Sequence, residues 1–139
     1  MGHVKAEGGV KMNTKHTKYL YKKYPVLYQQ HKLPVSETCM CWGFDCGDGW
    51  FNILDVLSRL LTLYLPDVQA LQVKEKYGTL RFYTNHCSET GYALISFAEH
   101  LSGRTCETCG NPGKLYDTGW YSTACVKCKE EHNKKKEGT

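Results

Sequence analysis

The stretch CETCGNPGKLYDTGWYSTACVKC, residues 106–128, decides how the carboxy-terminal part of this chain folds. It holds two CxxC pairs, Cys106/Cys109 and Cys125/Cys128, with fifteen residues between the pairs. Two residues between cysteines form a tight turn that directs both sulfur atoms to one point, and two such turns supply four thiolates to a tetrahedral zinc ion. Four protein ligands leave no open position for water or substrate. The spacing therefore predicts one structural Zn²⁺ site.

The residues around these cysteines predict a zinc module over residues 104–132. Residues 106–110 form the first zinc knuckle, KLYDTGWYSTA forms a hairpin around residues 117–119, and CVKCKEEHNKKK favours a helix. A knuckle, a hairpin and a helix whose first turn carries two ligands is a treble-clef arrangement. A zinc ribbon, with both pairs on knuckles, is the alternative. Zinc would supply most of the folding energy of so short a segment.

Upstream of the module, the pattern predicts a small body of helices and one β-hairpin over residues 19–103, so the fold class is α+β. One helix spans about residues 49–64, with Asp48 as its N-cap and Pro66 after its end. A second spans about residues 90–102. The apolar residues expected to face the core are Trp50, Ile53, Leu54, Leu57, Leu61 and Tyr64 in the first helix and Leu94, Ile95, Ala98 and Leu101 in the second.

The β-hairpin is predicted between these helices, with QALQVKE and TLRFYT as strands and a turn at residues 76–78. Alternation gives the inner face Leu71, Val73, Leu80 and Phe82. The outer face receives Gln72, Lys74, Arg81 and Tyr83. Two cations and a tyrosine on one strand face suit a phosphate or an acidic partner, and a solvated face is the alternative reading.

The stretch SETCMCWGFDCGDGW, residues 36–50, is rich in glycine, cysteine and tryptophan. Its glycines permit backbone angles closed to other residues, which predicts a tightly folded loop. The aromatic residues over this loop are Trp42, Phe44 and Trp50. Before it, Pro25 divides residues 19–34 into two short helical pieces. The tyrosines of those pieces that we expect to lie on the body are Tyr21, Tyr24 and Tyr28.

Charge is concentrated at the two ends of the chain. The net charge is +5 over residues 1–23, +2 over residues 127–139 and −3 over the residues between them. We expect residues 1–18 to form a flexible basic arm, with inert His3 and His16, and residues 133–139 to form a flexible basic tail. Such ends are commonly solvated, and recruitment of nucleic acid is the other reading.

The remaining cysteines raise the question of a second metal site. Cys39, Cys41, Cys46, His86 and Cys87 would be its ligands; the alternative is that these cysteines are buried as small apolar groups. Eight cysteines without an export signal favour thiols and metal over disulfides, and hence a cytoplasmic protein. No apolar run approaches the length that crosses a bilayer.

Enzymatic motifs are weak in this sequence. A zinc deaminase needs H-x-E followed by P-C-x-x-C, whereas this chain has HCSE at residues 86–89 and Thr105 in place of the proline. The predicted module hairpin lacks the histidine base of a treble-clef nuclease. A metal-dependent hydrolase would have to use carboxylates, which here are Asp45, Asp48, Asp55 and Glu75. We expect a protein that is not an enzyme.

Three strings carry a resemblance to a known family: ETCMCWGFDCGDGW, VQALQVKEKYGTLRFYTN, and AEHLSGRTCETCGNPGKL with a tryptophan and CxxC following. The chain resembles, over about residues 20–130, a family of short and largely uncharacterised proteins of bacteriophages and prophages. The resemblance implies a phage context inside a bacterial host cell. It supplies no catalytic residues.

That context favours action by binding, as an inhibitor of a host enzyme, an anti-defence protein or a modulator of transcription. We therefore expect a non-catalytic protein that binds a host protein or complex. Its expected contact residues are Trp42, Phe44, Asp48, Trp50, Lys74, Lys76, Arg81 and Tyr83. The first alternative is a nucleic-acid or nucleotide binder that uses Lys74, Arg81, Tyr83 and the lysine-rich ends. The second is the hydrolase.

Overall fold

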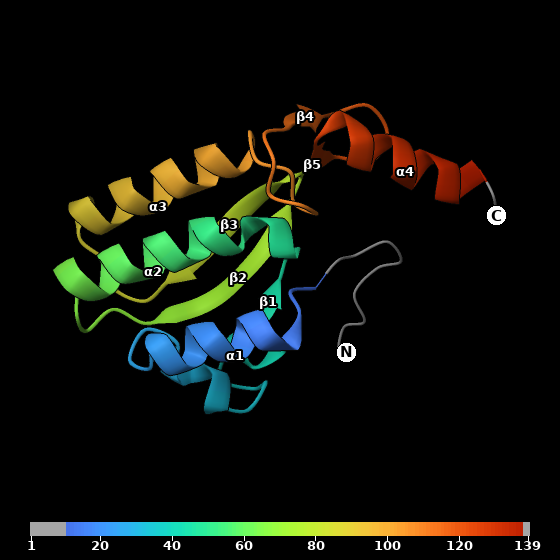
Figure 1. Cartoon of the computed structure of the whole chain (residues 1–139). Helices are drawn as coiled ribbons and strands as arrows, with labels where there is room; N and C mark the ends of the chain where they lie inside the picture. The colour runs from blue at the N-terminus through green and yellow to red at the C-terminus, as the bar shows by residue number, and fades with distance from the viewer. Residues whose placement is uncertain (1–10, 138–139) are drawn as a thin grey trace.

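Three helices lie over a three-stranded sheet, and a small hairpin with a fourth helix extends from one end of this body (Figure 1). The computed structural model describes residues 11–137. The helices of the body are α1 (Thr14–Lys23), α2 (Phe51–Tyr64) and α3 (Glu89–Ser102). The strands are β1 (Phe44–Asp45), β2 (Ala70–Lys76) and β3 (Thr79–Thr84), in the order β1-β2-β3. The α+β class is confirmed.

The carboxy-terminal elements are β4 (Lys114–Tyr116), β5 (Ser122–Ala124) and α4 (Val126–Glu137). β4 and β5 form an antiparallel pair of their own. Short 3₁₀ helices connect the larger elements of the body: η1 (Gln29–Lys32), η2 (Met40–Trp42) and η3 (Asp48–Trp50). Within residues 11–137, no helix is both long and apolar enough to cross a bilayer.

The first helix lies partly where the sequence predicted a flexible arm. Asn13 caps α1, because its side chain accepts a 2.7 Å hydrogen bond from the backbone N–H of His16. The His16 ring stacks on Phe51 with 4.0 Å between centroids, so it is not inert. Buried Met12 and Leu20 anchor this segment. The polar composition of this segment gave no indication of these few anchoring contacts. Residues 1–10, with His3, lie outside the described residues.

At the other end, α4 continues to Glu137, through residues 133–137 that the sequence assigned to a flexible tail. Residues 138–139 lie outside the description. The run KKK contains good helix formers, so charge alone did not end the helix.

Asp48 has a different role from the predicted one. It begins η3, and α2 follows from Phe51 without a side-chain cap. Its Oδ1 atom accepts a hydrogen bond from the Asn13 N–H and lies 2.9 Å from Nδ1 of His16. Asp48 therefore connects the start of α1 to the glycine-rich loop, residues 36–50. The prediction that it caps the following helix is wrong.

The β2–β3 hairpin has the predicted strands and a two-residue turn. Lys74 pairs with Arg81, and Lys76 pairs with Thr79. Between them the turn residues Tyr77 and Gly78 have φ of 54° and 87°, which is typical of a type I′ turn.

The start of β2 differs from the prediction. The register shifts between Ala70 and Gln72, which leaves Leu71 as an extra residue. This bulge turns Ala70 into the core, where it is fully buried, and leaves Leu71 half-buried. The expectation that Leu71 alternates inward with Val73 is therefore wrong, because strict alternation does not hold across a bulge.

The core joins all three helices to one face of the sheet. Tyr28 donates to or accepts from Ser58 Oγ at 2.6 Å, and its ring lies 5.0 Å from that of Phe44. Tyr24 is also buried and Tyr21 half-buried, as predicted. Tyr64 and Leu101, however, are 64% and 40% exposed, contrary to the prediction. Each lies near the end of its helix, beyond the part of the core that its predicted stripe reaches.

Candidate metal centre

The four cysteines of the two CxxC pairs come together, as their spacing predicted. The sulfur atoms of Cys106, Cys109, Cys125 and Cys128 all lie within 4.8 Å of one another. The Cys109 and Cys125 sulfurs are 3.7 Å apart. A tetrahedral ion with metal–sulfur bonds of about 2.3 Å separates its sulfur ligands by roughly 3.8 Å. The residues present therefore fit a four-thiolate metal site.

Two different pieces of backbone position the two pairs. Cys106 and Cys109 lie on a turn in which the Gly110 N–H donates to the Cys106 carbonyl at 2.9 Å, and Gly110 adopts a φ of 85°. Cys125 follows β5, and Cys128 lies in the first turn of α4. The amino end of a helix favours negative charge, which suits a thiolate.

The surroundings of the sulfur atoms shift their pKa values in opposite directions. Burial alone would raise the pKa of the Cys106 thiol, but backbone N–H groups of Cys109, Cys125 and Thr108 outweigh it and lower this pKa to about 7. Burial, together with hydrogen bonds among the four thiols, raises the pKa of Cys128. Four sulfurs this close together cannot all be thiolates without a cation between them.

The first knuckle packs directly against the glycine-rich loop. The Gly49 N–H donates to the Glu107 carbonyl at 2.7 Å, and the Gly47 N–H donates to Oε2 of Glu107 at 2.8 Å. A Cβ atom on Gly49 would lie 2.1 Å from the Cys106 carbonyl oxygen. Glycine is required here because the two backbones touch.

Further hydrogen bonds join the metal centre to the body. The indole N–H of Trp50 donates to the Thr105 carbonyl at 2.8 Å. Thr123 donates from Oγ1 to the carbonyl of Gly78, in the turn of the β2–β3 hairpin, at 2.6 Å. The carbonyl of Thr123 in turn accepts from the N–H of Glu107. The centre and the body therefore share one hydrogen-bonded junction.

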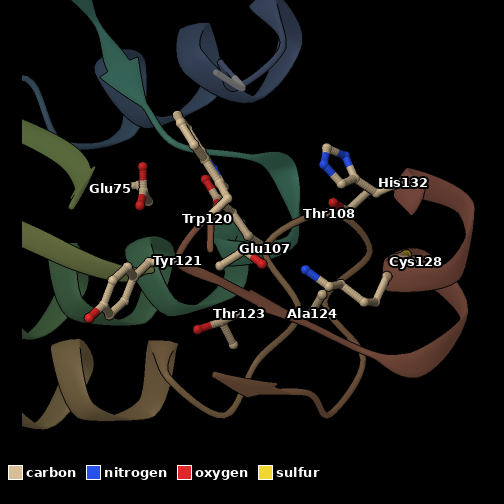
Figure 2. A pocket seen from close by; sticks show the side chains of 11 residues that line it. Glu75, Glu107, Thr108, Trp120, Tyr121, Thr123, Ala124, Cys128 and His132 are labelled. Carbon is tan, nitrogen blue, oxygen red and sulfur yellow. The ribbon is translucent and has the colours of Figure 1, made fainter. Parts of the chain in front are cut away.

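A hollow of about 100 Å³ lies against the metal centre (Figure 2). Trp120 and Glu75 lie on one side of it, and His132 and Thr108 lie on the other. Glu107, which projects between them, is engaged by the N–H of Gly47. One of the polar residues that line the hollow, Glu107, therefore already joins the knuckle to the glycine-rich loop.

The structure does not bring the other proposed ligands together. Within residues 11–137, the four cysteines above are the only group of three or more Cys, His, Asp or Glu side chains placed to hold a metal. The second zinc site is therefore not assembled. The same holds for the hydrolase carboxylates. Their contacts are instead with Lys11 for Asp45, His16 for Asp48, Tyr24 for Asp55 and the Gly78 N–H for Glu75.

The expected contact surface divides into buried and accessible parts. Phe44 and Trp50 are 1% and 0% exposed, so they cannot form a contact surface. Trp42 and Asp48 are half-buried and lie in the same loop. The glycine-rich loop that the sequence indicated as a contact surface packs against the first knuckle of the same chain.

The strand face, in contrast, is accessible. Lys74 and Arg81 are half-buried cross-strand partners, and Lys76 and Tyr83 are exposed. Nε of Arg81 is buried without a hydrogen-bond partner in the described part of the chain. The strand face, defined as Lys74, Lys76, Arg81 and Tyr83, is thus the part of the predicted surface that remains available.

Sequence reasoning missed the residues that connect the metal centre to the body. Thr105, Glu107 and Thr123 carry no motif, and their role depends on which backbone lies opposite. The only signal was the pair of glycines in GDG, which indicated a close approach without identifying the partner.

Comparisons with protein-family models, with curated proteins and with solved structures found no match to this chain.

Proposed function

We propose that this chain is a zinc-stabilised binding protein without a catalytic role for its metal. The convergence of four sulfur atoms at tetrahedral spacing supports this proposal most directly. All four coordination positions would be filled by cysteine, so no position remains for a substrate. The order of knuckle, hairpin and helix favours a treble clef over a ribbon, because one ligand comes from the first turn of α4.

In this proposal zinc holds the module against the body. The knuckle has little apolar core of its own, and its Glu107 backbone is bonded to the glycine-rich loop. Because the ion binds only when all four thiolates are assembled, its binding free energy becomes folding free energy.

A matched pair of cysteine substitutions tests the role of the metal. Cys109→Ser should remove bound zinc and make the region from residue 104 onward sensitive to protease. Cys39→Ser is the control, because Cys39 is also exposed and lies outside the centre. Zinc content by elemental analysis and limited proteolysis are the measurements. Full zinc retention and unchanged protease resistance in Cys109→Ser would show that this centre is not the site.

We further propose that the protein acts on a host macromolecule, in the manner of a phage accessory protein, through the strand face. The face carries three cations, and the nearest acid on β1, Asp45, has Lys11 at 3.9 Å. Carboxylates of an acidic partner would complement these cations. An acidic surface on a host protein or complex has this chemistry.

Affinity capture from a bacterial lysate tests this part. A host protein should be retained by the wild type after nuclease treatment, and lost with Lys74→Glu/Arg81→Glu. Lys18→Glu/Lys22→Glu, a double reversal at exposed positions of α1, should retain it. Retention by the strand-face double variant would remove that face from the proposal.

Nucleic acid is the second candidate, because phosphates offer the same acceptors to Lys74 and Arg81. In that case retention should disappear with nuclease and weaken steeply with salt. The same lysate experiment separates the two candidates.

A further inference from the structure

We propose that the outer face of α2 and α3 is a self-association surface, on which a second copy of this chain packs about a twofold axis. The two helices lie side by side over the sheet (Figure 1). Between them runs a hollow of about 260 Å³ whose lining is apolar apart from Asn52. The apolar lining residues are Ile53, Val56, Leu57, Leu60, Leu94, Phe97, Ala98 and Leu101.

Both helices carry more apolar residues than their buried stripes require. Val56 and Leu63 of α2 are 58% and 63% exposed, and they follow the spacing of Leu60 along one side of the helix. Phe97 and Leu101 of α3 are 69% and 40% exposed. These four side chains expose on the order of 400 Å², which is the size of the largest apolar patch on many monomers, and such patches are often functional.

An exposed aromatic side chain and a hollow lie on the same face. Phe97 stands at the edge of the hollow and projects into solvent. In a twofold contact the same patch meets itself, so Phe97 of each copy can enter the hollow of the other. Complete burial of these side chains in both copies would remove roughly 800 Å² from water, so neighbouring residues would have to supply the remainder of the ~1,200 Å² at which stable interfaces begin.

The lining of the hollow also argues against a partner selected by charge. No charged residue lines the hollow. The acids nearest to it in sequence are turned to other contacts, since Asp55 accepts from Tyr24 and Glu99 accepts from the N–H of Phe82. The exposed cation nearest to it in sequence is Arg59, which precedes Leu60, and a twofold contact would have to leave it in water at the rim.

Dimerisation through the helices would leave the strand face free. Val73, Leu80 and Phe82 point from the sheet toward the helices, whereas Lys74 and Arg81 alternate to the other side. A twofold dimer would thus present two strand faces on its outer surfaces. One dimer could then bind two sites on a repeated or extended partner, which raises avidity without any new contact.

Sedimentation equilibrium of the full-length, zinc-loaded chain tests this proposal. The wild type should approach twice the chain mass of 15.9 kDa as its concentration rises. Val56→Asp should remain a monomer, because a carboxylate would be buried without a partner. Val35→Asp is the matched control, because Val35 is 60% exposed and lies outside the helices, and it should dimerise as the wild type does.

Phe97→Ala provides a second variant that conserves apolar character. It should weaken dimerisation at least about tenfold, as expected for the central aromatic residue of an interface. Circular dichroism and zinc content should match the wild type in every variant. A wild type that stays a monomer at the highest concentration would overturn the proposal. So would a dimer that forms equally well with Val56→Asp and Phe97→Ala. A monomer that binds another protein through this face would also overturn it.

Discussion

Gly49 shows how strongly this fold depends on the absence of one side chain. Its backbone touches that of Cys106 and Glu107, so the knuckle can approach the loop only where no Cβ is present. The residue that matters to the metal centre is thus more than fifty positions away from it in the sequence.

Gly49→Ala should destabilise the protein by about 1–3 kcal/mol, the usual cost of forcing extra atoms into a packed site. The reason is the 2.1 Å approach of the new Cβ to the Cys106 carbonyl oxygen. Gly103→Ala is the control, because its Cβ would meet nothing closer than 3.4 Å. The free energy of unfolding in urea is the measurement. Equal free energies of unfolding for the two variants would contradict the close packing of Gly49 against the knuckle.

Three tyrosines should make the fold sensitive to alkali. Burial raises the pKa of Tyr21 to about 12, burial and the bond to Asp55 raise that of Tyr24 to about 12, and burial raises that of Tyr28. Each folded pKa exceeds the unfolded value of about 10, so the folded state holds the proton more tightly. The resulting stability is complete below about pH 10 and is lost as the pH rises toward 12.

Ultraviolet titration of the ten tyrosines measures this. Three phenols should ionise late and together with unfolding, whereas the same titration in denaturant should show a single class. A single class near pH 10 in the folded protein would contradict the burial of these side chains.

At the scale of single elements, the β2–β3 hairpin and α2 were predicted within a few residues. Local patterns determine these elements: alternation with a glycine turn in the first, and apolar periodicity in the second. The parts that failed depend on contacts across the chain. The bulge at Leu71 reverses the alternation of the strand. The Asp48 carboxylate bonds to Asn13 and His16 and does not cap α2.

The metal centre and the outer face of α2 and α3 show the same division. The cluster of four cysteines followed from CxxC spacing alone, because four-thiolate zinc sites require that spacing. The junction through Thr105 and Thr123 followed from no local rule. The apolar surplus of α2 was visible in its sequence, but which of its two apolar sides faces the core depends on α1 and the sheet.

The capping of α1 gives a prediction at this scale. Asn13→Ala should cost about 1 kcal/mol, because the backbone N–H of His16 loses its partner at the start of the helix. Lys18→Ala, at an exposed position in the same helix, should change stability little. Urea denaturation compares them. An unaffected Asn13→Ala would indicate that the first turn of α1 does not contribute to the fold.

At the scale of the whole molecule, the metal centre and the body should unfold as one unit. Bonds from Trp50 to Thr105 and from Thr123 to Gly78 cross between them. Heating the zinc-loaded protein should therefore give a single calorimetric transition. A chelator should move that transition to lower temperature, because the body loses the knuckle that covers its glycine-rich loop. Two separate transitions with metal bound would show that the two parts are independent.

The account as a whole depends on one metal ion held by four sulfur atoms. X-ray absorption at the zinc edge of the purified protein measures this directly. We predict one zinc ion per chain with four sulfur neighbours at about 2.3 Å and no nitrogen or oxygen in the first shell. An ion with an oxygen or nitrogen ligand, or a chain that binds no zinc, would contradict the structural role assigned to Cys106, Cys109, Cys125 and Cys128.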